Sequence, residues 1–402
     1  MNRLCGKPAF HGLIALVLLM LSGCATTPPK PLEQQTFFPP PPEPARLQFL
    51  VSYTGSLDIE APRSAFATFV TGEKDRDQKL DKPYGVAIHD GKIYVCDTNM
   101  TVMVFDLQKR SFEPLQGAQG LGKLVQPINI SIDRDGNKYV SDPVRQQVVM
   151  FDKNDFYVKA FGTPGEWKPL DAAVFEDRLY VADIRNSEIR VLDINTGEDV
   201  ARLGKVGEPS EFLDKPTNLV IDKDGYLYVS DAGRFQIVKM DRDGHVLGTF
   251  GRVGTNLGHF ARPKGVAVDR EGRVFVVDAV FYNVQIFNPK GFMLLFFGGG
   301  GTKPGDLILP AKVIVDYANT KYFEPYVDPN FIMESLVLVT SQFGDRRVNV
   351  FAFGREKGRK YLTDDELLEQ VRKIEATVVQ KNPNDDGKKG GVEKADDAGK
   401  TE

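Results

Sequence analysis

The sequence predicts an all-β fold, a six-bladed β-propeller of four-stranded antiparallel blades, from two repeating observations. A proline opens a short apolar run six times, at intervals of 44, 42, 47, 47 and 47 residues: Pro83, Pro127, Pro169, Pro216, Pro263 and Pro310. After five of these runs an aromatic-Val-x-Asp motif returns and ends at Asp97, Asp142, Asp183, Asp231 and Asp278. The sixth copy, residues 338–341, is degraded. A fixed period of this length, built from strand-like runs, is typical of propeller blades.

Residues 1–23 have the pattern of a secretory signal, with a basic start, an apolar stretch over residues 13–21 and small residues before Cys24. Residues 21–24, Leu-Ser-Gly-Cys, resemble a bacterial lipobox. The resemblance implies cleavage before Cys24 and lipidation of its thiol; the alternative is a plain signal peptide with an incidental cysteine. Several acyl chains anchor a protein stably where one would not. Ala25 follows Cys24, which by the same resemblance favours the outer membrane if the host is a diderm.

Cysteine usage and charge exclude several classes of protein. Cys5 would be removed with the signal peptide and Cys24 would be acylated. Cys96 then remains as a single cysteine with no disulfide partner, which we expect to be a buried and inert thiol. Removing residues 1–23 subtracts two basic residues from a net charge of -4 and so gives -6. A mildly acidic chain without a basic run is not suited to nucleic acid.

Residues 24–45 are rich in proline and predict an extended tether that holds the propeller off the membrane. Residues 46–53 then resemble a strand that precedes the first repeat, while the last repeat lacks its fourth strand. Joining the two completes one blade and removes both exposed edges. We therefore expect a monomeric propeller over residues 46–355, closed by strand 46–53 in the last blade.

The turns within each repeat carry a family resemblance. Asp-x-x-Gly turns, as at residues 133–136 and 222–225, separate the first two strands, and outer connections carry Phe-Gly-x-x-Gly patterns, as at residues 250–254. Together with Val-x-x-Phe-Asp after the Tyr-Val-x-Asp motif, these residues strongly resemble the NHL repeat family from about residue 46 to 355. The resemblance implies six blades around a central channel and interaction surfaces as the default role.

Two segments depart from the repeat. Residues 317–334 replace a short hairpin in blade six, and their aromatic side chains predict a partner-binding loop that uses Tyr322, Phe323, Tyr326 and Phe331. After the ring, a capping box at residues 363–366 and apolar residues at helical spacing predict a helix over residues 362–380. Residues 381–402 are almost free of apolar residues and predict a disordered tail.

The residue two positions after each proline should ring the mouth of the channel. These six residues are Gly85, Asn129, Asp171, Asn218, Gly265 and Lys312. Oxygens of Asn129, Asp171 and Asn218, on consecutive blades, could converge on a cation such as Ca²⁺, the one cofactor the sequence suggests. The simpler interpretation is that a repeated turn demands residues that tolerate a left-handed backbone. Lys312 escapes this interpretation and stays a candidate ligand-binding residue.

The recurrent aspartates have a structural explanation, because a group repeated in five blades is expected to accept backbone N–H bonds in the loop that it opens. The neighbouring loops diverge, and Arg145, Arg185 and Arg234 could form an electropositive rim for an anionic ligand. Separate solvated arginines are the alternative.

The function expected from these features is that of a lipid-anchored extracytoplasmic scaffold that binds a protein or ligand in the bacterial cell envelope. After signal removal only His89, His245 and His259 remain, and no Gly-x-Ser-x-Gly or His-Glu-x-x-His motif occurs. This scarcity of catalytic groups argues against an enzyme. The alternative is a metal-dependent lyase or lactonase-like enzyme with its site at the channel mouth.

Overall fold

The computed structural model describes residues 35–62, 77–205, 207–363, 366 and 369. The signal (1–23), the lipidation site Cys24, the first part of the tether and the tail lie outside these residues. So does almost all of the predicted helix, whose capping box is nevertheless formed: the Thr363 N–H donates to Glu366 Oε2 (2.8 Å) and the Glu366 N–H to Thr363 Oγ1 (3.3 Å). Among the described residues no helix is long and apolar enough to cross a membrane.

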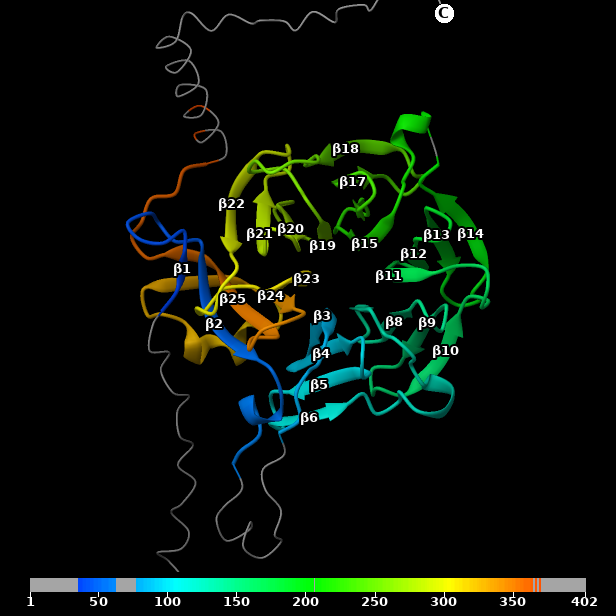
Figure 1. Ribbon diagram of the computed structural model, residues 1–402, viewed down its shortest axis with the longest axis horizontal. Coiled ribbons are helices and arrows are strands. Elements are labelled where there is room, and N and C mark those ends of the chain that lie inside the picture. The colour runs from blue at the N-terminus through cyan, green and yellow to red at the C-terminus, as the bar shows by residue number, and fades with distance from the viewer. Residues whose placement is uncertain (1–34, 63–76, 206, 364–365, 367–368, 370–402) are drawn as a thin grey trace, which may run out of the picture. The chain divides into compact units, whose positions relative to one another are not determined.

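Six antiparallel sheets form the ring and confirm the predicted fold class (Figure 1). The first strand of each blade begins at or near its proline, and neighbouring first strands lie side by side around the axis. These six strands are β3 (Pro83–His89), β7 (Asn129–Ile132), β11 (Pro169–Phe175), β15 (Pro216–Ile221), β19 (Pro263–Val268) and β23 (Pro310–Asp316).

The second, third and fourth strands follow outward from the axis in each of the first five blades (Figure 1). In blades one to three they are β4 (Lys92–Asp97), β5 (Val102–Asp106), β6 (Ser111–Pro114), β8 (Lys138–Asp142), β9 (Gln147–Phe151), β10 (Tyr157–Phe161), β12 (Arg178–Asp183), β13 (Glu188–Asp193) and β14 (Asp199–Leu203). In blades four and five they are β16 (Leu227–Asp231), β17 (Gln236–Met240), β18 (Val246–Phe250), β20 (Val274–Asp278), β21 (Asn283–Phe287) and β22 (Met293–Gly298).

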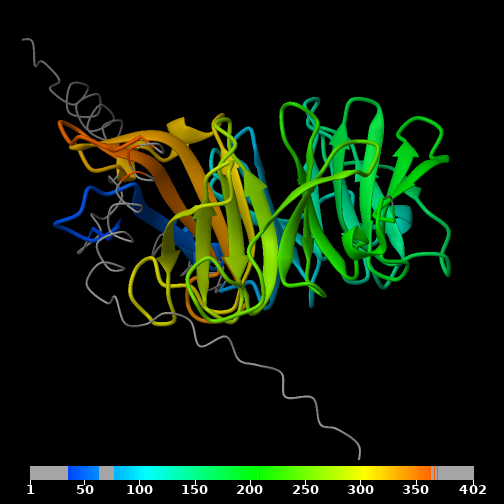
Figure 2. The same ribbon diagram turned by 90° about the horizontal axis from the view of Figure 1, so that it is seen from above.

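Blade six is closed by the N-terminal strand, as predicted. Its order is β1-β2-β25-β24-β23, where β24 is Phe331–Ser341, β25 is Val348–Glu356 and β2 is Leu47–Tyr53. The rings of Phe49 and Phe351 pack at 5.5 Å across the β2–β25 seam. The strands from the two ends of the ring, β2 and β25, therefore lie side by side in one sheet, as the blue and orange strands in Figure 2 show, and neither is left unpaired.

The C-terminal part of the expected tether is not a free spacer. Phe37–Phe38 form β1, which pairs with β2 and adds a fifth strand to blade six. The Phe38 ring lies 6.1 Å from that of Phe297 and 6.2 Å from that of Phe351. The rings of Phe37 and Phe38 pack on hydrophobic side chains of blades five and six, and this packing holds the chain before residue 45 against these blades.

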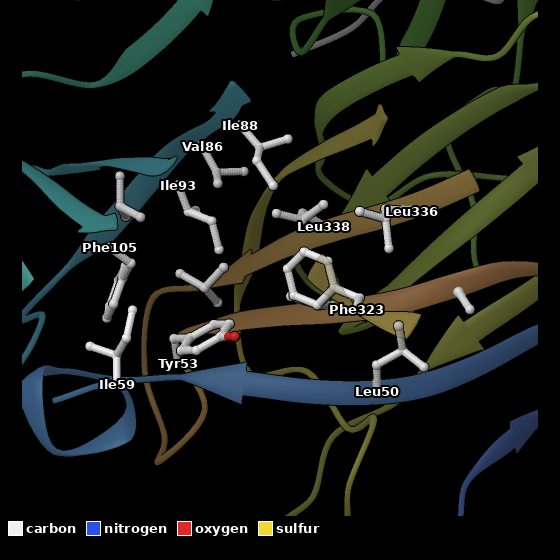
Figure 3. Close-up of a cluster of buried hydrophobic side chains, with 14 of the residues drawn as sticks. Leu50, Tyr53, Ile59, Val86, Ile88, Ile93, Phe105, Phe323, Leu336 and Leu338 are labelled. Atoms are coloured by element: carbon white, nitrogen blue, oxygen red, sulfur yellow. The ribbon is translucent and has the colours of Figure 1, made fainter. Parts of the chain in front are cut away.

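The hydrophobic core is divided among the interfaces between blades. Figure 3 shows the cluster between blades six and one, to which Leu50, Val86 and Leu338 belong. A second cluster between blades one and two contains Cys96, which is completely buried as expected for an inert thiol. Each blade thus buries its two faces against its neighbours, the arrangement expected for a repeat fold.

The insertion in blade six is part of this core. Phe323 is 0% exposed and Phe331 is 4% exposed, and both belong to the cluster shown in Figure 3. Tyr322 Oη accepts a hydrogen bond from Gln108 Nε2 of blade one (2.8 Å), and the Tyr326 carbonyl accepts one from Gln48 Nε2 (3.1 Å). The expectation that these aromatic residues form a partner-binding surface is therefore wrong for Phe323 and Phe331, because their rings stabilise the junction of blades six and one.

Candidate functional site

The recurrent aspartates orient the segments that lead into the channel. Asp183 accepts the backbone N–H of Lys168 (2.9 Å), Asp231 that of Lys215 (2.9 Å), and Asp278 that of Arg262 (3.1 Å). Asp97 and Asp142 accept the equivalent bonds in blades one and two. The predicted structural role of these carboxylates is confirmed. It also means that in blades one to five the residue before the proline is held in the same way, on the face that we call the proline face.

The residues two positions after the prolines form one layer at the axis, where they are all buried. They are Gly85, Asn129, Asp171, Asn218, Gly265 and Lys312. Their backbones are not left-handed, because none of these six residues has a positive φ. The explanation from turn geometry is therefore wrong.

Close packing of neighbouring blades explains the two glycines instead. A Cβ built on Gly265 would lie 2.6 Å from the Cα of Lys312, and one on Gly85 would lie 2.6 Å from the Cα of Asn129. The first strands approach too closely at these two blade junctions for any side chain. Space around the axis, set by long-range packing, selects the residue at this position.

An ion pair crosses the axis in this layer. Lys312 Nζ lies 2.5 Å from Asp171 Oδ2, and both side chains are buried, 7% and 1% exposed. Lys312 is on β23 of blade six and Asp171 on β11 of blade three, which are opposite strands of the ring. The pair therefore closes the channel at the level of the layer.

The Asp171 carboxylate has a complete set of donors. Besides Lys312, its Oδ2 accepts from Leu219 N–H (3.2 Å) and Asn218 Nδ2 (3.3 Å), and its Oδ1 from Ala172 N–H (3.0 Å). The strand that carries the lysine is held as well, because the backbone N–H of Lys312 donates to Thr340 Oγ1 (3.1 Å). A buried ion pair requires such additional hydrogen bonds to be stable.

The three predicted metal ligands are thus brought together, but they do not fit a divalent cation. The ammonium of Lys312 already occupies the cation position at Asp171, the only carboxylate of the three. Asn129 Oδ1 and Asn218 Oδ1 are buried without a hydrogen-bond partner within the described parts of the chain, and two amide oxygens alone are a weak ligand set. A separate group on the β17–β18 hairpin, the half-buried Asp241 with the exposed Asp243 and His245, brings its ligand atoms within 4.8 Å of one another and could hold a metal ion.

The pair separates two compartments of different chemistry. On the side of the Asp-Gly hairpins, the hairpin face, a cavity of about 220 Å³ is lined mainly by aliphatic residues of the first strands, with Asp171 and Lys312 at its end. On the proline face the next side chains are Lys264 and Tyr84, each one position after its proline. The amine of Lys264 lies 4.9 Å from the centre of the Tyr84 ring.

This contact places Lys264 over the channel mouth. Lys264 belongs to blade five and Tyr84 to blade one, and blade six lies between them. Lys264 is 7% exposed, and the described part of the chain offers its amine no hydrogen bond or ion pair. Burial, and then the positive charges of Arg262 and Lys82, lower the pKa of Lys264 to about 8. Burial and the negative charge of Asp171 raise the pKa of Tyr84.

Four of the six residues before the prolines are basic: Lys82, Lys168, Lys215 and Arg262. None of these side chains forms an ion pair with another described residue, and Lys168, Lys215 and Arg262 are exposed. Sequence reasoning missed them and Lys264. Aligning the repeats at the positions directly before and after each proline would have found them.

The arginines expected to form a rim have other partners. Arg145 donates to the carbonyl oxygens of Lys123 (2.6 Å) and Leu121 (2.9 Å). In the same way Arg185 binds the Gly165 carbonyl (2.6 Å), and Arg234 binds those of Pro209 (3.3 Å) and Ser210. Each arginine ties down the loop that leads into its own blade.

No family model matches the chain. Among solved structures, it is similar to a Bacteroides thetaiotaomicron protein of unknown function (TM-score 0.54, 15% identity, covering 77% of this chain and 76% of that one). It is also similar to an auxiliary nutrient binding protein from the same organism (TM-score 0.52, 11% identity, 69% and 70% covered) and to a Xanthomonas campestris gluconolactonase (TM-score 0.51, 15% identity, 76% and 98% covered). At these identities the similarity shows the propeller fold and nothing beyond it.

Proposed function

We propose that the protein is an envelope-facing, lipid-anchored propeller that binds a ligand or protein partner at the channel mouth and does not carry out metal-dependent catalysis. The anchor is the acylated Cys24, which the lipobox-like sequence supports. The observation that carries the proposal at the site is the ion pair between Lys312 and Asp171 across the axis. An ammonium in hydrogen-bond contact with the only carboxylate of the layer fills the place that a catalytic cation would take.

The lactonase-like or lyase-like alternative has one observation in its favour. Asn129 Oδ1 and Asn218 Oδ1 are buried oxygens without partners in the described residues, and buried polar atoms of this kind can accept a bound ligand or water. For these oxygens to share a divalent cation with Asp171, Lys312 would have to leave its hydrogen-bonded position.

Metal titration distinguishes the two functions. Thermal unfolding of the full-length protein is recorded with and without Ca²⁺ and Mn²⁺, for the wild type and for Lys312→Met. We expect no response from the wild type, and a metal-dependent rise in melting temperature only in Lys312→Met, where the ammonium no longer competes for Asp171. A rise in the wild type that Asp171→Asn abolishes would support the metal-dependent enzyme and refute the proposal.

A further inference from the structure

We infer that the proline-face mouth of the channel is a binding site for an oxyanion, the carboxylate or phosphate group of a small soluble ligand, with Lys264 as its central contact. This inference deepens the proposed function and rests on it, because it names the chemistry that the channel mouth would recognise. It is carried by the position, burial and missing partner of Lys264, and by the basic residues that the repeat places around it.

The first step concerns the amine itself. A buried lysine is normally paired, since taking an ammonium out of water is unfavourable unless other groups compensate for it. Among the described residues the amine of Lys264 has only the face of the Tyr84 ring beneath it. Its Nζ atom is not one of the fully buried unpaired atoms, so the amine is reached from the solvent in the mouth. A cation–π contact of this kind stabilises a charge by less than the cost of removing that charge from water. An anion entering the mouth would supply the missing partner.

The second step concerns the charges that face this amine. Two charged groups act on Lys264: Arg262, which lies just before its strand β19, and Lys82, which lies just before β3 of blade one. Both are positive. No acidic group among the described residues offsets them at the amine. A mouth with several positive charges and low-dielectric walls concentrates anions.

The third step concerns the floor of the site. The pair of Lys312 and Asp171 lies one residue deeper and is internally neutralised, with the carboxylate fully hydrogen-bonded. An anion at Lys264 therefore meets a closed floor with no net charge. The floor also keeps the anion from passing into the apolar cavity.

The basic residues before the prolines of blades three and four extend the site on one side of the channel mouth. Lys168 and Lys215 stand before the prolines of blades three and four and are held like Arg262 by the recurrent aspartates. Their side chains are exposed and unpaired with other described residues. They can reach a second charged group on a ligand whose first group is held at Lys264, which favours ligands with more than one anionic group. Bidentate contact by Arg262 suits both carboxylate and phosphate.

Binding and protonation should be coupled at this site. A bound anion favours the charged form of Lys264 and raises its pKa from about 8. Anion binding near this pH is then accompanied by proton uptake, and affinity falls as the pH rises above it. The neighbouring groups do not mask this effect, since arginine stays charged and burial raises the pKa of Tyr84.

The test uses the full-length protein in detergent, with citrate and inorganic phosphate as probes at constant ionic strength. Isothermal titration calorimetry in buffers of different ionisation enthalpy reports both affinity and proton uptake. We expect saturable binding that weakens at least tenfold in Lys264→Met and weakens in Arg262→Ala. The matched control is Lys153→Met, an exposed lysine on a hairpin of blade two, which should bind as the wild type does.

The two probes identify the source of the oxyanion. Tighter binding of citrate points to a polycarboxylate, and tighter binding of phosphate to a phosphorylated ligand; either result supports the site. Equal binding by Lys264→Met and the wild type, or no saturable binding of either probe, would overturn the inference. Neither of these negative results bears on the metal titration, so the inference can fail while the proposed function stands. Binding only to anionic lipid vesicles would also overturn it in favour of a membrane contact.

Discussion

The ion pair across the channel offers the sharpest test of how this propeller is held together. We consider Asp171→Asn, Lys312→Met and the double variant. The amide in Asp171→Asn keeps an oxygen that can accept the Leu219 N–H, and methionine has nearly the length of lysine. The substitutions therefore remove charge while keeping shape and most hydrogen bonds.

The expected magnitudes follow from the distance and the burial. At the 2.5 Å separation of Lys312 Nζ and Asp171 Oδ2, the attraction is about 6–7 kcal/mol for an effective dielectric constant of about 20. Desolvation of two buried ions offsets most of it, at several kcal/mol per ion. The intact pair and its neutral replacement should thus be similar in stability. Each single variant instead leaves one buried charge unpaired and should lose about 3–5 kcal/mol.

The measurement is urea unfolding of all four proteins, followed by tryptophan fluorescence and circular dichroism. We expect each single variant to be strongly destabilised and the double variant to lie within about 1 kcal/mol of the wild type. Added salt should change this pattern little, because buried charges are poorly screened. If the two single effects simply add in the double variant, the charges do not share a buried site and the closed channel is incorrect.

Three further predictions concern the blade junctions. Gly265→Ala should lose about 1–3 kcal/mol, because a Cβ there would lie 2.6 Å from a backbone atom of blade six, whereas Gly248→Ala, with open space around it, should change unfolding little. Phe323→Ala should lose about 3–5 kcal/mol in urea unfolding, because its ring is fully buried; unchanged stability would restore the insertion as a free docking loop. Asp155 is held by Lys138 Nζ (2.6 Å) and Lys92 Nζ (2.9 Å); burial raises the pKa of Asp155, but these hydrogen bonds outweigh burial and lower it. Its stabilisation is therefore present above the unfolded pKa of about 4 and is lost as the pH falls through the lower folded value, so the acid-induced loss of stability should be smaller in Asp155→Asn than in the wild type.

The ring itself was predictable from the sequence because its cause is local and repeated. Each blade carries its own proline, and each of the first five blades also carries an aspartate that holds the loop preceding it. Closure was predictable too, because one unpaired strand at the start matches one missing strand at the end. The sixth blade tolerates the loss of its aspartate since Ser341 Oγ accepts the Ile308 N–H in its place (3.2 Å).

The candidate site was only partly predictable, because its chemistry depends on residues far apart in the chain. Lys312 is an exception to the repeat that the sequence shows directly. Its partner Asp171 is 141 residues away, and only the position of blades three and six on opposite sides of the ring brings the two together. The sequence pattern favours backbone conformation as the reason for the two glycines of the axial layer, whereas in the structure the short distance between blades selects them. The aromatic insertion looked like a binding loop because nothing in the sequence shows that blades six and one bury it.

Lys264 is the residue whose cost to stability argues most directly for a function. Its pKa is lowered from 10.5 to about 8 by burial and by Arg262 and Lys82, which corresponds to about 3 kcal/mol at about 1.4 kcal/mol for each pH unit. Between these two values the unfolded chain binds more protons than the folded one, so the stability of the wild type should rise with pH there. Lys264→Met should therefore unfold at higher urea than the wild type near pH 7, and the difference should shrink as the pH approaches about 10.5. A destabilised Lys264→Met would mean that the amine serves the fold. A Lys264→Met variant that is more stable than the wild type would mean that the charge of Lys264 at the channel mouth is not required for folding. A charged residue that lowers stability in this way is typical of a binding site.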